Sequence, residues 1–452
     1  MVEKSKYTLL LTFILVSSIL FNIINNIEKI GNYMDEEFHV DQTLAYYKNN
    51  FEYWNSKLTT FPGTFLLSSI FLKLSNSLQV HINDNNSLKI LRMFSIIISS
   101  LTFYILGFFK KKTNVEKYIL HRFQLLICFL PINFFYNFLY YTDTFSIFSL
   151  VVFFYLNLYA TKNYFLRFLS GILCVLIRQN NIIWINLMTL NDTISSFQNC
   201  FNNMSVRILF KEIYSTIIRN IDILIIDILF IVFFASNNFS VVLGDKSNHN
   251  IVFHLAQVNH LLIFSLVFFP TFNFKVLRNL SRLLNSRKKA MRFTFLFFFV
   301  ILLVLICNRF SYIHDFILSD NRHYMFYYFK KIYLKDNLRY ALLIYVSLAY
   351  TIIINDNIKL LKDNRIISWF ICSILCLAPS KLVEMRYFTP CYIILIILVN
   401  YNKESFDDLN QLMFNWWNIW AHLIMNGVTL YIFLFRQFEN KYMNNEISRF
   451  MY

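Results

Sequence analysis

The sequence predicts an all-α polytopic membrane protein. Of its 452 residues, 57% are hydrophobic and 19% aromatic, whereas only 15% are charged. Soluble domains carry about 45–50% apolar residues and about 25% charged residues. One soluble core cannot bury this excess, and apolar runs long enough to cross a bilayer recur along the whole chain. We therefore interpret residues 1–452 as a single multispan domain.

The net charge and the cysteines exclude two other classes of protein. The net charge of +16 is the Lys/Arg excess expected of cytoplasmic loops, and no aromatic-basic motif accompanies it, so we expect no nucleic-acid partner. Most of the cysteines lie inside apolar runs and none forms a CxxC pair, which predicts buried thiols and no zinc or disulfide framework. The seven are Cys128, Cys174, Cys200, Cys307, Cys372, Cys376 and Cys391.

Thirteen apolar segments are predicted as membrane helices. The first begins at Tyr7 after Lys4 and Lys6 and lacks a small-residue cleavage site. We expect it to be an uncleaved signal anchor with a cytoplasmic N-terminus. The predicted spans are 7–27, 62–80, 88–109, 119–140, 144–160, 165–195, 221–242, 251–272, 293–310, 338–356, 366–380, 387–401 and 416–436.

Basic clusters between these spans indicate the cytoplasmic side. They are Lys110–Lys112, Lys162 with Arg167, 207–219, 275–292 and 359–365, which leaves the polar islands 31–60, 141–143, 244–250, 311–337 and 378–386 on the other side. Two segments leave the topology open. Residues 62–109 show two apolar runs where an odd number of crossings is needed. Residues 165–195 are too long for one crossing and too short for two, so we expect two short arms that meet at the polar residues 178–181.

The segment 31–61 is the strongest candidate for chemistry. It follows the first span and carries Asp35, Glu36, His39 and Gln42. A carboxylate at this position is suited to act as a general base towards a hydroxyl. The apolar residues behind it predict a short interfacial helix. The alternative is a solvated acidic loop with no catalytic role.

Further polar groups lie within or beside the spans, where burying polarity is costly. A helix-terminal acid is the alternative for Asp143, and a structural ion pair is the alternative for Arg178 and for Arg386 beside Glu384. Cations at the entrance of a helix are suited to hold a phosphate. From these residues alone we infer a membrane enzyme or a transporter that handles an anionic or lipid-linked substrate. The candidates are Asp143, Arg178, Gln179, Asn181, Lys246, His249, Arg322, His323, Tyr324, Glu384 and Arg386.

Eight ordered blocks resemble one family, the endoplasmic-reticulum α-1,2-glucosyltransferases that use dolichyl-phosphate glucose. They cover the chain from residue 33 to 452: YMDEEFHVDQ, TTFPG, FNFLYYTD, RQNNIIW, GDKSNH with HLAQ, DNRHYMFYYFKK, EMRYF and RFMY. The sequence departs from the family pattern at several positions. Glu37 and Asp41 are two extra acids in the first block, Phe61 replaces a proline, and Asn180 and Met385 also differ.

The resemblance implies a GT-C-like bundle of roughly 12–14 transmembrane helices in the endoplasmic-reticulum membrane, with lumenal loops that form the active site. It implies inverting transfer of the last glucose from dolichyl-phosphate glucose to a diglucosylated dolichyl-diphosphate oligosaccharide, by a protein expected to act as a monomer. No cofactor is expected, and the acidic loop leaves room for a weakly bound divalent cation.

The resemblance also implies roles for the candidate residues. Asp35, with Glu36 second, is expected to be the base. The donor phosphate is assigned to Arg322, His323, Arg386, Lys246 and His249. The sugar and acceptor pocket is assigned to Arg178, Gln179, Asn181, Asp143, His39, Gln42, Tyr324 and Glu384. The alternatives are another GT-C lipid-linked sugar transferase or a polytopic transporter, although transporters often contain internal repeats and none is visible here.

Overall fold

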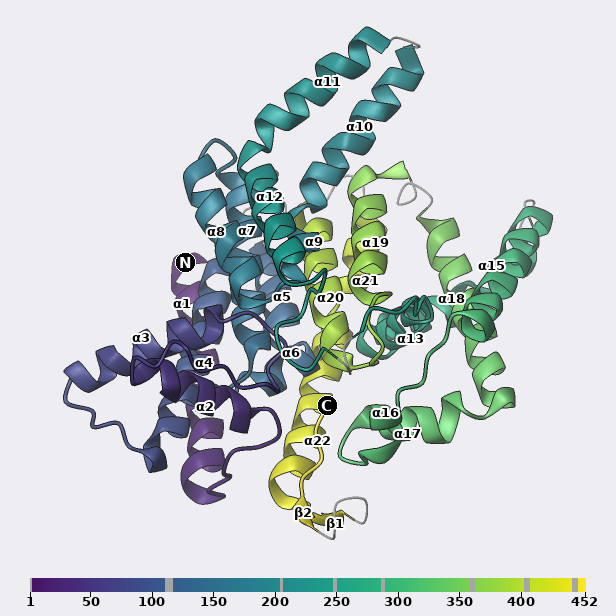
Figure 1. The fold of residues 1–452 in the computed structure, drawn as a ribbon. Coiled ribbons are helices and arrows are strands. Elements are labelled where there is room, and N and C mark those ends of the chain that lie inside the picture. The colour runs from purple at the N-terminus through teal and green to yellow at the C-terminus, as the bar shows by residue number, and fades with distance from the viewer. Residues whose placement is uncertain are drawn as a thin grey trace. The chain divides into compact units, whose positions relative to one another are not determined.

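The computed structural model is helical almost throughout, which confirms the predicted all-α class (Figure 1). The strands in the described part are β1 (Phe438–Asn440) and β2 (Glu446–Ser448), which pair antiparallel. The structure describes residues 2–109, 117–203, 206–246, 250–285, 289–357, 362–401, 407–440 and 446–452. Two compact units divide the chain: residues 1–109 with 136–249, and residues 110–135 with 250–452.

The first unit contains the acidic segment and the helices that pack around it. α7 packs against both α4 and α8, and α2 packs against α3. Its helices are α1 (Val2–Asn22), the π-helix η1 (Ile23–Ile27), α2 (Glu36–Tyr47), α3 (Gly63–Ser77), α4 (Asp84–Leu106), α7 (Thr142–Tyr159), α8 (Tyr164–Ile177), α9 (Asn181–Ile185), α10 (Leu187–Asn203), α11 (Val206–Arg219) and α12 (Ile221–Ser236).

The second unit contains the remaining helices, and α15 and α14 both pack against α18. The bounds are α5 (Lys117–Cys128), α13 (Gln257–Phe268), α14 (Pro270–Asn285), α15 (Lys289–Arg309), α16 (Asp315–Ser319), α17 (Tyr324–Tyr328), η2 (Phe329–Tyr333), α18 (Asp336–Asp356), α19 (Asn364–Leu377), α20 (Met385–Tyr401), α21 (Asp407–Met413) and α22 (Trp416–Phe435). The short α6 (Pro131–Tyr136) ends at the boundary between the units.

Fewer helices than expected are long and apolar enough to cross a membrane. Six in the described residues qualify by length and composition, and a seventh qualifies if a bent pair counts as one span. Several predicted spans are divided by polar or proline-containing breaks, which is why the expected 12–14 spans are not all single long helices. The six are Tyr7–Ile27, Asn86–Leu106, Thr142–Tyr159, Ala290–Arg309, Asp336–Asp356 and Leu409–Phe435.

Two breaks matter for the sites described below. The predicted span 165–195 is interrupted at Arg178, whose extended backbone (φ −146°, ψ 122°) ends α8 before the short α9 begins. In the second unit, α13 and α14 meet at an angle of 87°, where Pro270 begins the second helix.

The open question about residues 62–109 has a structural answer. α3 has 15 residues and therefore measures about 22 Å, which is shorter than a hydrocarbon core of about 30 Å. α4 has 23 residues and qualifies as a span. Of the two predicted runs, only α4 is therefore long and apolar enough for a full crossing, and Lys110–Lys112 lie outside the described residues.

The core of the first unit lies under the acidic segment. Val40 of α2 belongs to a buried apolar cluster that also contains Leu72 of α3, Leu91 of α4 and Phe145 of α7. Because these four residues come from four different helices, the cluster fixes α2 against three other elements.

Candidate active site

A buried ion pair anchors the start of α2. The Glu36 carboxylate accepts hydrogen bonds from Arg92 Nε at 2.8 Å and Arg92 Nη2 at 2.5 Å, and both side chains are fully buried. It also accepts the backbone N–H of Tyr140 at 2.7 Å and of Tyr33 at 3.0 Å. A carboxylate offers about four acceptor positions, so these four bonds engage its whole capacity.

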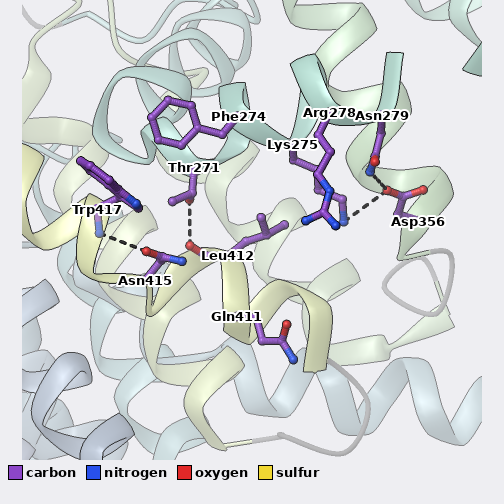
Figure 2. A pocket seen from close by; sticks show the side chains of 10 residues that line it. All are labelled: Thr271, Phe274, Lys275, Arg278, Asn279, Asp356, Gln411, Leu412, Asn415 and Trp417. Atoms are coloured by element: carbon purple, nitrogen blue, oxygen red, sulfur yellow. Dashed lines mark hydrogen bonds and ion pairs between the residues drawn. The ribbon is translucent and has the colours of Figure 1, made fainter. Parts of the chain in front are cut away.

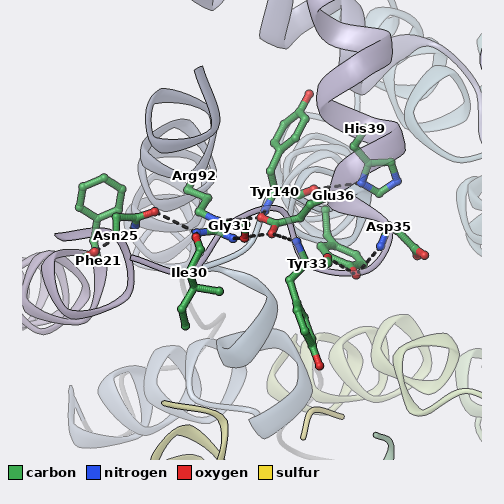
Figure 3. A network of polar contacts seen from close by, with 11 residues as sticks. Phe21, Asn25, Ile30, Gly31, Tyr33, Asp35, Glu36, His39, Arg92 and Tyr140 are labelled. Atoms are coloured by element: carbon green, nitrogen blue, oxygen red, sulfur yellow. Dashed lines mark hydrogen bonds and ion pairs between the residues drawn. The ribbon is translucent and has the colours of Figure 1, made fainter. Parts of the chain in front are cut away.

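Arg92 is equally engaged. Its guanidinium also donates to Asn25 Oδ1 at 3.0 Å, to the Ile30 carbonyl at 2.9 Å and to the Gly31 carbonyl at 2.8 Å. Figure 3 shows the guanidinium between Asn25 and Glu36. The five hydrogen bonds that Arg92 donates and the four that Glu36 accepts thus belong to one network, which joins the end of the first span to α2 and α4.

Asp35 has a different environment from its neighbour. It is half-buried and precedes α2, and its carboxylate points away from the Arg92–Glu36 pair (Figure 3). Its backbone N–H donates to the Tyr141 hydroxyl at 3.1 Å. Met34 has a positive φ of 56°, which turns the chain just before Asp35. Glu37, the third consecutive acid, is exposed.

His39 and Gln42 hold this segment together from the buried face of α2. The Nδ1 of His39 lies 2.9 Å from the Tyr140 carbonyl, and its ring packs against Phe65. Gln42 donates from Nε2 to the Tyr53 carbonyl at 2.9 Å and accepts the Asn55 N–H at 2.8 Å. Gln42 therefore closes the loop that follows α2.

Asp143 and Arg178 form an ion pair beside the acidic segment. Arg178 Nη1 lies 2.7 Å from Asp143 Oδ1, and the side chains are 17% and 11% exposed. This pair is more accessible than the fully buried Arg92–Glu36 pair. Asp143 follows Tyr141, the residue that contacts Asp35, by two positions. These contacts bring Asp35, Asp143 and Arg178 into one region of the first unit.

The break between α8 and α9 is held by its own polar side chains. Gln179 Nε2 donates to the Thr59 carbonyl at 2.7 Å, which ties the break to the acidic segment. Asn181 Nδ2 donates to Ser146 Oγ and to the Cys174 carbonyl, both at 2.9 Å. Both side chains are buried, and Asn181 adds a second donor to the Cys174 carbonyl, which also accepts the Arg178 N–H at the end of α8.

The GDKSNH block lies against the end of the acidic segment. The N–H groups of Gly244 and Asp245 donate to the carbonyls of Leu58 and Ser56, each at 3.0 Å. Lys246 Nζ lies 2.9 Å from Asn237 Oδ1, which directs the ammonium towards the end of α12. His249, predicted as a phosphate ligand, lies outside the described residues.

The second unit contains the DNRHY block. Arg322 donates from Nε and Nη2 to the two carboxylate oxygens of Asp320 at 2.8 and 2.7 Å. Burial alone would raise the pKa of Asp320, but the hydrogen bond from Arg322 and the charge of His323 lower it below its usual value of 3.8. Asp320 therefore stays ionised and orients the Arg322 guanidinium.

The C-terminal residues complete this block. His323 Nδ1 lies 2.8 Å from the main-chain oxygen of Tyr452, and the Met451 N–H donates to the Arg322 carbonyl at 2.8 Å. The Tyr324 hydroxyl lies 2.8 Å from Thr429 Oγ1 in α22. A short parallel bridge thus fixes the block RFMY beside DNRHY.

Glu384 and Arg386 form a close ion pair at the start of α20, and both side chains are partly exposed. The loop before them is held by His254 and Gln257, which the sequence did not predict as site residues. His254 Nδ1 lies 3.2 Å from the Ser380 carbonyl, and Gln257 Nε2 donates to the Leu382 carbonyl at 2.8 Å. Both belong to the HLAQ block. The sequence signal that could have identified them as site residues is that they are polar residues at the edge of an apolar run, where burial is costly.

The predicted site residues are therefore divided between the two units. The first contains the acidic segment with Asp143, Arg178 and Lys246, and the second contains the DNRHY and EMRYF blocks. Among the described residues, no group of three or more His, Cys, Asp or Glu side chains has a metal-binding arrangement. The geometry offers a half-buried carboxylate for proton transfer and several cations held in place by carboxylates.

Comparisons with known proteins find one matching family and several relatives. Residues 30–397 match the profile of the DIE2/ALG10 family. The chain is 27% identical to the Drosophila melanogaster protein named Dol-P-Glc:Glc(2)Man(9)GlcNAc(2)-PP-Dol alpha-1,2-glucosyltransferase, over 94% of each chain. Proteins with the same name from Homo sapiens (27% identical, 97% of this chain and 96% of the relative) and Candida albicans (28%, 95% of each) are similarly related. No solved structure matches the chain.

Proposed function

Because the chain belongs to the DIE2/ALG10 family, we propose that it transfers glucose in α-1,2 linkage from dolichyl-phosphate glucose to a diglucosylated dolichyl-diphosphate oligosaccharide. The protein is a glycosyltransferase with several membrane-spanning helices. One observation carries this proposal: the match to relatives named for this reaction extends over nearly the full length of both chains. It therefore includes every block that holds a candidate residue.

Asp35 is the proposed catalytic base. An α-linkage made from a β-linked donor requires inversion, and a single in-line displacement with one base accomplishes it. The base takes the proton from the acceptor 2-hydroxyl, a bond forms from that oxygen to the anomeric carbon, and dolichyl phosphate leaves. The carboxylate of Asp35 is half-buried and points away from the Arg92–Glu36 pair. The Glu36 carboxylate, by contrast, already accepts hydrogen bonds from Arg92 and from two backbone N–H groups at all four of its acceptor positions.

The other candidates supply orientation and charge. We assign the Asp143–Arg178 pair to binding sugar hydroxyls, since it is partly exposed and lies in the same region as Asp35. In the second unit, Arg322 and Arg386 are partly exposed and each is oriented by a carboxylate two residues away. Such oriented cations are suited to stabilise the charge that grows on a phosphate leaving group. The proposed setting is the endoplasmic-reticulum membrane, with the acidic segment in the lumen and the protein acting as a monomer.

A transfer assay with matched variants tests the proposal. Purified full-length protein in detergent would receive dolichyl-phosphate glucose and a lipid-linked oligosaccharide that already bears two glucoses. We expect wild type to add a third glucose and Asp35→Asn to lose at least a hundredfold in rate, since a general base contributes about 10²–10⁴-fold. Glu37→Gln is the control, because it removes an exposed acid from the same segment.

Two outcomes would contradict the proposal in different ways. If folded wild type transferred no glucose to this acceptor, the assignment of the reaction would be wrong. If Asp35→Asn kept near-normal turnover, the reaction would stand but the base would have to be another group.

A further inference from the structure

The second unit contains a cavity that the proposed reaction does not use. It has a volume of about 560 Å³, within the usual range for small-ligand sites, and lies among α14, the end of α18, α21 and the start of α22 (Figure 2). Its lining residues are mostly polar, basic or aromatic: Thr271, Phe274, Lys275, Arg278, Asn279, Asp356, Gln411, Leu412, Asn415 and Trp417.

The charge of the lining favours an anion. Lys275 Nζ lies 3.4 Å from Asp356 Oδ2, and Asn279 Nδ2 donates to the same oxygen at 2.7 Å. Asp356 is thereby satisfied by two partners. Arg278 is exposed on the next part of α14 and forms no ion pair with any residue that the structure describes. Two cations and one carboxylate leave a net positive charge in the cavity.

Its walls have the character of a membrane interface. α14 turns through 87° from α13 and exposes Phe274 (51%) and Leu277 (73%). The start of α22 exposes Trp417 (64%), whose ring lies edge-on to Phe274 with the centroids 6.2 Å apart. Tryptophan and basic side chains are typical of the headgroup level of a bilayer. A lipid can therefore approach the cavity with its acyl chains along this apolar surface.

The cavity and the candidate active-site block DNRHY lie at opposite ends of the same span. Asp356, in the cavity wall, is the last residue of α18, whereas the segment that holds Arg322 precedes its first residue, Asp336. The 21 residues of α18 measure about 32 Å, roughly the thickness of the hydrocarbon core. Lys275 and Arg278 of the cavity wall belong to the basic cluster 275–292, which the sequence predicts to be cytoplasmic.

We propose that this cavity binds the phosphate headgroup of an anionic membrane lipid. The guanidinium of Arg278 and the ammonium of Lys275 contact the phosphate, and Phe274 and Trp417 flank the glycerol and the first part of the acyl chains. The cytoplasmic leaflet is rich in anionic lipids, so the predicted orientation presents the cavity to them. The site does not depend on the glucosyl transfer, because its argument uses no residue of the proposed reaction.

Native mass spectrometry of the full-length protein in detergent tests this site. The protein would be titrated with phosphatidic acid, with phosphatidylcholine and with soluble glycerol 3-phosphate. We expect saturable binding of one phosphatidic acid molecule per protein. The other two compounds should bind at least tenfold more weakly. Arg278→Gln should lower the affinity for phosphatidic acid about five- to tenfold. This corresponds to the roughly 1 kcal/mol that one basic residue contributes near an anionic surface.

The matched control is Lys362→Gln, which removes one positive charge from an exposed residue outside the cavity wall. It should leave the affinity within twofold of wild type. Equal binding by Arg278→Gln and wild type would overturn the proposal, and so would equal loss in the control. Glycerol 3-phosphate that bound as tightly as the lipid would show a soluble phosphate site and overturn the lipid assignment.

Discussion

Replacing Glu36 by glutamine should unfold the start of α2 rather than only stop the chemistry. The amide keeps the shape of the carboxylate but turns one acceptor oxygen into an NH₂ group. That group must face either Arg92 Nε and the Tyr140 N–H or Arg92 Nη2 and the Tyr33 N–H, all of which are donors. It also leaves the Arg92 charge unpaired in a fully buried position.

The expected loss in the free energy of unfolding is about 3–5 kcal/mol, the usual cost of removing one partner of a buried ion pair. Asp35→Asn, by contrast, changes a half-buried side chain outside this network and should alter stability by about 0.5 kcal/mol or less. Denaturant unfolding of the two purified variants in mixed micelles, followed by intrinsic fluorescence, measures this difference.

A double variant extends the test. Glu36→Leu combined with Arg92→Met removes both charges, so its loss should be smaller than the sum of the two single losses. Part of the loss should remain, because the carbonyls of Ile30 and Gly31 lose their donor. If Glu36→Gln were as stable as wild type and yet inactive, the structural role would be refuted and Glu36 would become the better candidate for the base.

Three further predictions follow from other parts of the structure. Arg322→Gln should raise the KM for dolichyl-phosphate glucose about tenfold with little change in the KM for the acceptor, and the exposed Arg436→Gln should change neither in the same steady-state assay. Gly63→Ala should lower the unfolding temperature, since its Cβ would lie 2.5 Å from the Leu176 carbonyl oxygen and overpacking costs about 1–3 kcal/mol, whereas Gly31→Ala meets nothing within 4 Å and should melt like wild type. Burial lowers the pKa of His254 below its usual 6.5, so its stabilising contribution is complete above pH 6.5 and is lost as the pH falls. Thermal unfolding between pH 8 and 5 should therefore show a smaller acid-induced loss in His254→Gln than in wild type, and equal losses would contradict the role of burial.

The apolar pattern predicted the membrane class well because the burial of apolar side chains determines it. The number of long helices was harder to predict, since hydropathy does not show where a run breaks. The break after α8 was predicted from the polar residues 178–181, and in the structure the Asn181 side chain bonds Ser146 of another helix there. The bend at Pro270 depends on local backbone chemistry inside one apolar run. Only this bend leaves a continuous hydropathy signal.

Asp35 and Glu36 show the corresponding limit for the candidate site. They are adjacent and equally acidic in the sequence, yet one is half-buried and the other is enclosed by Arg92, 56 residues away. The informative residue was Arg92, a charge inside the predicted span 88–109, because a charge at such a position requires a buried partner. His254 and Gln257 were missed as site residues for a similar reason, because their partners are backbone carbonyls that no pattern reveals.

The bridge between the C-terminal residues and the DNRHY block has a consequence for the order of biosynthesis. His323 and Tyr452 are 129 positions apart. At about 5–20 residues per second, translation takes roughly 6–26 s to travel from one to the other. Throughout that interval α16 and α17 can already be made, but the bonds from Tyr452 to His323 and from Met451 to the Arg322 carbonyl do not yet exist. The DNRHY block therefore gains its bonds to the RFMY block only after residues 451 and 452 have been made, and a nascent chain that lacks RFMY should leave His323 without its contact to Tyr452.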